Sequence, residues 1–172
     1  AKAWDELAVK DSCELLCEPG RALVAEAESV IVRVDARRGN ALYVNDGAYG
    51  SLMEVKFMHF TPPVRVWRGA RVHDNDQEFS EFTIWGPTCD SYDVLPQVFT
   101  LPADIDEDDW IEFGLMGAYT QASLTPFNGF DRRDDLADIR QGQLFEVGRI
   151  GHRDVLTSDR DHRRVKEVER LL

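Results

Sequence analysis

Residues 29–45, SVIVRVDARRGNALYVN, decide the fold class of this chain. Ser29–Asp35 and Ala41–Asn45 are short runs rich in apolar and β-branched residues, and Arg37–Asn40 between them has the residues of a turn. The stretch therefore predicts two strands joined by a turn. Similar runs follow at Val64–Trp67, Phe79–Trp85, Val98–Leu101, Trp110–Met116 and Leu144–Ile150. Many short strands separated by Gly, Pro, Asn and Asp predict a mainly β domain, built as a sandwich or as a partly closed barrel.

The first 28 residues have a different pattern. Residues 1–9 are expected to form the last turns of a helix. Cys13–Cys17 is a short apolar run, predicted to be a strand that ends at Pro19. Residues 22–28 suit one or two helical turns. A helix, a strand and a second helix in this order are typical of a β/α unit.

The chain is therefore expected to have two parts. Residues 1–28 are predicted to be the end of an α/β domain, and residues 29–172 a β-domain that closes with a helix at Arg160–Leu172. The sequence has no initial Met and opens inside a helical pattern, so we expect it to begin within a longer gene product.

Composition limits the classes of function. The 172 residues contain 20 Lys and Arg against 32 Asp and Glu, a net charge of −12, which argues against nucleic acids and mildly favours cationic small molecules. No apolar run approaches the roughly 20 residues of a membrane span. The three cysteines are too few for a disulfide framework, so we expect a cytoplasmic protein. The four histidines are scattered, and Asp104–Asp109 lacks the Gly and Glu of a calcium loop, so no metal site is predicted and this run is interpreted as a solvated loop.

Two short segments could carry chemistry. Glu18-Pro19-Gly20-Arg21 precedes a predicted helix, where backbone N–H groups, a glycine turn and an arginine can bind a phosphate; the alternative is a strand-ending turn with a surface ion pair. Gly86-Pro-Thr-Cys89-Asp90-Ser91 follows an aromatic strand and places a thiol beside a carboxylate; the alternative is a buried structural cysteine. Gly117–Thr120 and Thr125–Phe130 are rich in glycine and aromatic residues, and alone they indicate a turn and core packing.

Taken in order, five motifs resemble the ornithine decarboxylase family, a group of pyridoxal-phosphate enzymes of the alanine-racemase-like fold type. The motifs are Glu18–Arg21, Val44-Asn-Asp-Gly-Ala-Tyr-Gly50, Gly86–Ser91, Gly117–Tyr119 and Phe127-Asn-Gly-Phe130. The resemblance covers about residues 10 to 130. Asp90, where diaminopimelate decarboxylases have Glu, places the chain on the ornithine and lysine side of the family. The resemblance implies a C-terminal Greek-key β-barrel or sandwich domain that follows the last β/α unit of a TIM barrel.

The resemblance also implies the role of each candidate residue. Glu18 would pair with the pyridine nitrogen of pyridoxal 5'-phosphate, whose phosphate Gly20, Arg21 and Tyr119 would bind. Cys89 would direct reprotonation of the substrate, and Asp90 would bind the distal ammonium of a diamino acid. Cys89 and Asp90 would act in the partner subunit's site of a homodimer, and Phe127 would supply an apolar wall near the cofactor.

Two departures from the family pattern affect these expectations. The lysine that binds the cofactor covalently lies upstream in the family, and Lys10 only mimics its motif, so we expect the 172 residues alone to be inactive. Met58 stands where the ornithine-type pattern has an Asp for the distal amine, and Glu54 is the neighbouring carboxylate that could compensate. The alternatives are a decarboxylase of another amino acid and a non-catalytic, decarboxylase-like regulatory protein.

Overall fold

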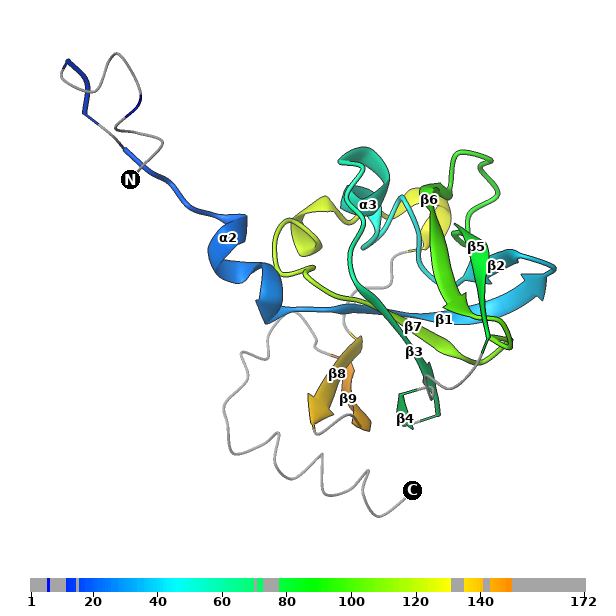
Figure 1. The fold of residues 1–172 in the computed structure, drawn as a ribbon. Helices are drawn as coiled ribbons and strands as arrows, with labels where there is room; N and C mark the ends of the chain where they lie inside the picture. The colour runs from blue at the N-terminus through cyan, green and yellow to red at the C-terminus, as the bar shows by residue number, and fades with distance from the viewer. Residues whose placement is uncertain are drawn as a thin grey trace.

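The computed structural model describes residues 6, 12–14, 16–69, 71–72, 78–130, 135–140 and 143–149. In these residues nine strands form one mixed sheet in the order β6-β5-β2-β1-β7-β3-β4-β9-β8 (Figure 1). The strands are β1 (Val30–Arg38), β2 (Ala41–Val44), β3 (Val64–Arg68), β4 (Arg71–Val72), β5 (Phe79–Trp85), β6 (Val94–Pro102), β7 (Trp110–Phe113), β8 (Asp135–Arg140) and β9 (Gln143–Arg149). The neighbours pair antiparallel except β2 and β5, which are parallel.

Short helices precede β1 or lie between later strands. They are α2 (Arg21–Val24), η1 (Ala25–Ala27), α3 (Met53–Phe57), η2 (Gln121–Ser123) and η3 (Phe127–Gly129). α2 and η1 confirm the helical turns expected at residues 22–28, whereas α3 was not predicted. Four to five residues of helix carry little intrinsic stability, so α3 depends on packing, mainly of the fully buried Val55.

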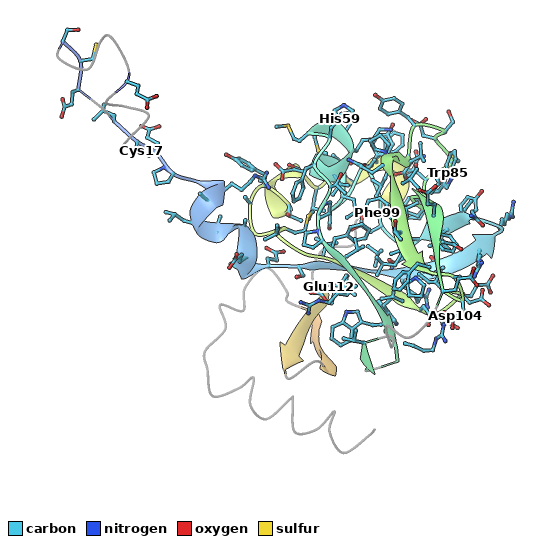
Figure 2. All side chains as sticks on the ribbon, in the orientation of Figure 1. Cys17, His59, Trp85, Phe99, Asp104 and Glu112 are labelled. Atoms are coloured by element: carbon cyan, nitrogen blue, oxygen red, sulfur yellow. The ribbon has the colours of Figure 1, made fainter. Side chains whose placement is uncertain are left out.

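The sheet curls around a single apolar core. Phe99 on β6 and Phe113 on β7 are separated by three strands in the sheet order, yet their ring centroids lie 5.6 Å apart in an edge-to-face contact. Figure 2 shows Phe99 inside this curl. Inward residues alternate along β1, where Val30, Val32 and Val34 are buried. The prediction of a mainly β domain is confirmed, and the sheet has the curvature of a partly closed barrel.

Several strand boundaries differ from the predicted ones. β5 matches its prediction at both ends, whereas β6 begins at Val94 instead of Val98. Between Thr83 and Trp85 the β5–β6 register shifts, and Pro96 lies in the irregular stretch of β6, so the alternating pattern is broken there. β4 and β8 were not predicted, because β4 has two residues and β8, DLADIR, has a charge at each end and at its middle.

The strand predicted at Cys13–Cys17 is absent from the described part of the chain. Residues 12–14 and 16–20 are exposed and form no strand, and Figure 2 shows Cys17 away from the sheet. A buried parallel strand needs hydrogen-bonding neighbours on both sides, and none of the described strands pairs with this segment. The helices predicted at residues 1–9 and Arg160–Leu172 lie outside the described residues, apart from Glu6, and the division at residue 28 stays a prediction.

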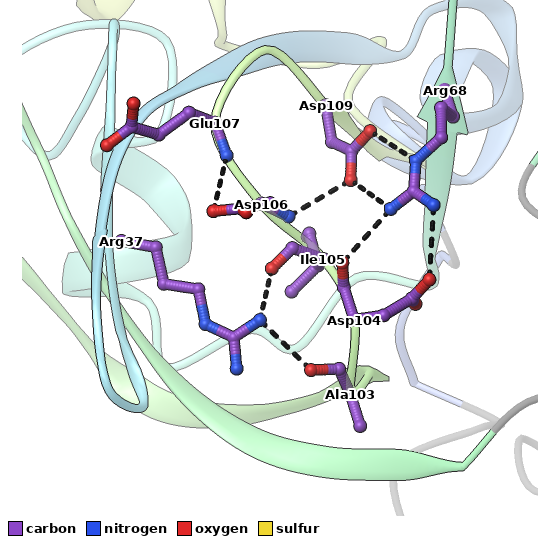
Figure 3. A network of polar contacts seen from close by, with 8 residues as sticks. All are labelled: Arg37, Arg68, Ala103, Asp104, Ile105, Asp106, Glu107 and Asp109. Carbon is purple, nitrogen blue, oxygen red and sulfur yellow. Dashed lines mark hydrogen bonds and ion pairs between the residues drawn. The ribbon is translucent and has the colours of Figure 1, made fainter.

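Asp104–Asp109 is more than a solvated loop. Asp109 is 4% exposed, and its carboxylate accepts hydrogen bonds from Arg68 Nε at 2.9 Å and Nη2 at 2.8 Å (Figure 3). It also accepts one from the Asp106 backbone N at 3.0 Å. On the other side of the loop, Arg37 Nη1 donates to the carbonyls of Ala103 and Ile105. Two arginines therefore fix the connection between β6 and β7.

Replacing Asp109 with alanine tests this network. We expect Asp109→Ala to lower the free energy of unfolding by about 1–3 kcal/mol, because it leaves the Arg68 guanidinium and the Asp106 N–H without this acceptor. Urea denaturation followed by tryptophan fluorescence measures the change. Glu107→Ala, at an exposed position of the same loop, is the control and should stay within about 0.5 kcal/mol of the wild type. Equal stability of the two variants contradicts the assignment.

Candidate functional site

The turn at Gly20 and Arg21 packs against the loop that follows β7. Gly117 N donates to Ala25 O at 3.0 Å, and a Cβ on Gly117 would lie 1.8 Å from Val24 O. Only glycine allows this approach. Residues 19–21, 23–24 and 117–119 line a pocket of about 350 Å³. The structure thus brings together Gly20, Arg21 and Tyr119, the three residues predicted to hold a phosphate.

Arg21 has an incomplete set of partners in this cluster. Its Nη2 forms an ion pair with a carboxylate oxygen of Glu54 on α3. Its guanidinium carbon lies 5.6 Å from the ring centroids of both Phe60 and Tyr119, within the range of cation–π attraction. Its Nη1 is buried and has no hydrogen-bond partner in the described part of the chain. A buried charged donor without an acceptor is costly, which is the state expected where a bound anion completes the contacts.

The second cluster forms because β2 and β5 are parallel. Tyr43 pairs with Trp85, so the loops that leave the two strands start side by side. Asp93, 1% exposed, joins these loops: its carboxylate accepts hydrogen bonds from Ala48 N at 2.7 Å and from Thr88 N and Oγ1 at 3.0 and 2.7 Å. The sequence analysis missed Asp93, because an aspartate in a loop usually indicates a solvated position.

Asp90 lies in this cluster beside two aromatic rings. The Tyr49 hydroxyl donates to Asp90 Oδ2, and Tyr92 N donates to Asp90 Oδ1 at 2.9 Å. The Tyr49 hydrogen bond is the main reason that the pKa of Asp90 is lowered and that the pKa of Tyr49 is raised to about 12. The Tyr49 ring stacks on Phe127 with centroids 4.1 Å apart. Asp90 is therefore held as an ionised acceptor.

Cys89 is an exposed free thiol next to Asp90, so it is not a buried structural cysteine. Asn128 Nδ2 approaches its Sγ at 3.5 Å from η3, the helix that also carries Phe127. Thr125 N and Oγ1 donate to Tyr49 O at 3.2 and 2.7 Å, which holds this segment against the Tyr49 loop. The structure thus brings together the predicted residues Cys89, Asp90 and Phe127.

Glu18, Met58 and Glu54 are the remaining candidate residues. Glu18 is exposed and does not line the pocket beside Arg21. Met58 is 69% exposed, so it is not part of the core. Glu54 is paired with Arg21 and is therefore not a free carboxylate for a distal amine. The roles that the sequence analysis gave to individual residues stay predictions.

The described residues contain no group of three or more His, Cys, Asp and Glu side chains placed to hold a metal ion. None of the helices within the described ranges has the length and apolar character needed to span a membrane. The fold and the two clusters define a mainly β domain with a turn that could bind an anion and a thiol beside an ionised carboxylate.

Comparison with known proteins gives the family. Residues 22–117 match the model described as "Pyridoxal-dependent decarboxylase, C-terminal sheet domain". The chain belongs to the pyridoxal-dependent decarboxylase family, through this C-terminal sheet domain.

Individual relatives agree with this assignment. The chain is 41% identical to an ornithine decarboxylase of Schizosaccharomyces pombe, covering 69% of this chain and 30% of the relative, and 36% identical to one of Panagrellus redivivus, covering 86% and 38%. A solved lysine/ornithine decarboxylase of Vibrio vulnificus, complexed with cadaverine, is 34% identical with a TM-score of 0.55, over 67% of this chain and 31% of that one. The chain thus spans about a third of the length of these proteins.

Removing the Tyr49 hydroxyl tests the electrostatics of the second cluster. We expect Tyr49→Phe to raise the pKa of Asp90 toward its ordinary value, because the largest cause of the lowering is lost. Because the folded-state pKa of Asp90 is lowered, the Tyr49–Asp90 interaction stabilises the fold above the ordinary carboxyl pKa of about 3.9 and is lost as the pH falls through the lowered value. Carboxyl-carbon NMR titration measures the pKa of Asp90, and urea denaturation at several pH values measures the stability of the fold. Tyr43→Phe, which removes a hydroxyl from a ring stacked on Trp85, should leave the Asp90 titration unchanged.

Proposed function

We propose that this chain is the C-terminal portion of a cytoplasmic, pyridoxal-phosphate-dependent decarboxylase that acts on ornithine or lysine in polyamine biosynthesis. The observation that carries the proposal is the meeting of Cys89, Asp90 and Phe127, from loops far apart in the sequence, in a cluster where Asp90 is ionised. The names of the relatives, ornithine decarboxylases and a lysine/ornithine decarboxylase, support the same substrate class.

The cluster around Arg21 fits the phosphate of pyridoxal phosphate. The Nη1 of Arg21 lacks a partner in the described residues, and open space surrounds the position that a Cβ on Gly20 would take. Arg21, the backbone of Gly20 and the Tyr119 hydroxyl would hold this group, with Glu18 as the carboxylate for its ring nitrogen. When bound, pyridoxal phosphate supplies an electron sink for the charge left by the loss of CO₂.

Cys89 and Asp90 would serve the substrate. The Asp90 carboxylate, kept ionised by the Tyr49 hydroxyl, binds the distal ammonium and so fixes the length of the substrate in the site. The Cys89 thiol donates a proton to the α-carbon after CO₂ leaves, and Phe127 excludes water on one side of the site.

These roles require a homodimer with shared active sites. The second cluster is surrounded by exposed aromatic residues, Phe57, Tyr92, Phe127 and Phe130, with exposed fractions of 48%, 55%, 37% and 39%. Such a surface is typical of an interface. We expect the chain to form dimers in sedimentation-velocity experiments and Tyr92→Glu to weaken them. A chain that stays monomeric at high concentration contradicts the dimer.

Asp90→Ala in the full-length enzyme tests the substrate role. A charge-assisted contact contributes about 1.5–3 kcal/mol, so kcat/KM for a diamino acid should fall by roughly 10- to 200-fold. Binding of pyridoxal phosphate, followed by its absorbance, should change little. Asp35→Ala, at an exposed position on β1, is the matched control. Equal kcat/KM in Asp90→Ala and Asp35→Ala contradicts the role of Asp90.

Met58→Asp tests the chain-length preference. We expect the full-length variant to prefer ornithine over lysine more strongly than the wild type does, because the new carboxylate adds an acceptor for the distal amine. Since Met58 is 69% exposed, the melting temperature should stay close to that of the wild type. An unchanged ratio of the two kcat/KM values means that position 58 does not contact the substrate.

A second candidate is a decarboxylase of another amino acid. It is favoured by Met58, which has no carboxylate, and by the pairing of Glu54 with Arg21. Of the two carboxylates considered for the distal amine, only Asp90 is therefore available. Comparing CO₂ release from ornithine, lysine and arginine by the full-length enzyme separates the two candidates. A full-length protein that releases no CO₂ from any of them instead matches the non-catalytic alternative.

A further inference from the structure

Glu54 is a carboxylate for which the proposed site has no assigned use. It lies in the first turn of α3 with 11% of its side chain exposed, and it forms an ion pair with Nη2 of Arg21. The Arg21 side chain is 36% exposed, so the pair is buried mainly on the Glu54 side, and removing Arg21 would leave the Glu54 charge uncompensated. The pair therefore determines where the Arg21 guanidinium lies.

The second terminal nitrogen of the Arg21 guanidinium, Nη1, does not take part in this ion pair. Nη1 of Arg21 has no hydrogen-bond partner among the described residues, while the guanidinium is 5.6 Å from the centroids of Phe60 and Tyr119. One carboxylate and two rings thus hold Arg21 and leave part of its hydrogen-bonding capacity for another acceptor. An arginine side chain has many rotamers, and fixing one of them in advance removes an entropic cost of binding.

We propose that Glu54 is a positioning residue that holds Arg21 in the orientation that binds the cofactor phosphate. The inference rests on the proposed function, since it takes Arg21 as the phosphate ligand. Glu54 acts through Arg21 and does not contact the cofactor. It thereby links α3, which also carries Lys56 next to the second cluster, to the turn that precedes α2.

The direction in which Glu54 changes the binding of phosphate tests the proposal, because electrostatic repulsion would act in the opposite direction. A carboxylate close to a phosphate repels it, so a Glu54 that only competed for Arg21 would weaken the binding of the anion. A positioning Glu54 strengthens it. Glu54→Gln keeps an oxygen that accepts from Arg21 and removes the charge, whereas Glu54→Ala removes both.

The experiment measures the binding of pyridoxal 5'-phosphate, and of inorganic phosphate, to the full-length enzyme by isothermal titration calorimetry. We expect Glu54→Ala to weaken the binding of pyridoxal phosphate by about 10-fold, the size found where a partner that orients a ligating group is lost. Glu54→Gln should bind with an affinity between those of Glu54→Ala and the wild type. Glu26→Gln removes the same charge from an exposed position on η1 and should bind as the wild type does.

A thermal-unfolding cycle of Arg21→Ala, Glu54→Ala and the double variant reports the contact without any ligand. The melting temperatures should be non-additive, because either single change removes the same ion pair. Additive shifts overturn the proposal. Tighter or unchanged binding of pyridoxal phosphate in both Glu54 variants also overturns the proposal. In that case the proposed function still stands. If the full-length wild-type enzyme binds neither probe, the phosphate role of Arg21 is itself wrong.

Discussion

The parallel pairing of β2 with β5 is the constraint on which the second cluster depends. Two strands that run in the same direction deliver their following loops to the same end of the sheet. Asp93 then fixes the distance between these loops, since its buried carboxylate accepts backbone hydrogen bonds from Ala48 and Thr88. Tyr49 and Asp90 meet because each lies close to one of these anchored residues.

The short helix α3 connects this cluster with the one at Arg21. Glu54 reaches Arg21, while Lys56 Nζ donates to Val94 O at 2.8 Å and lies 4.0 Å from the Tyr92 ring centroid. Two clusters that the sequence separates by about seventy residues are thus both contacted by side chains of one short helix, two positions apart. A substitution on α3 therefore has consequences for both clusters together.

Local sequence patterns predicted part of the fold and of the two clusters, but not all of either. β5 could be placed at both ends because its apolar and β-branched residues alternate, and the candidate residues around Arg21 and Cys89 were recognised from their motifs. The apolar run Cys13–Cys17 was wrongly predicted as a strand, since a strand also needs partners that no local pattern reveals. The role of Asp93 follows only from the parallel pairing, which joins residues about forty positions apart.

At one edge of the sheet, β6 ends the order of the described strands, so none of these strands pairs with its outer side. Such an edge can template the addition of a strand from another molecule and so start aggregation. Pro96 of β6 has no N–H to donate and lies in the stretch where the register with β5 shifts. A proline in an edge strand is one of the features by which proteins limit uncontrolled extension of a sheet into fibres.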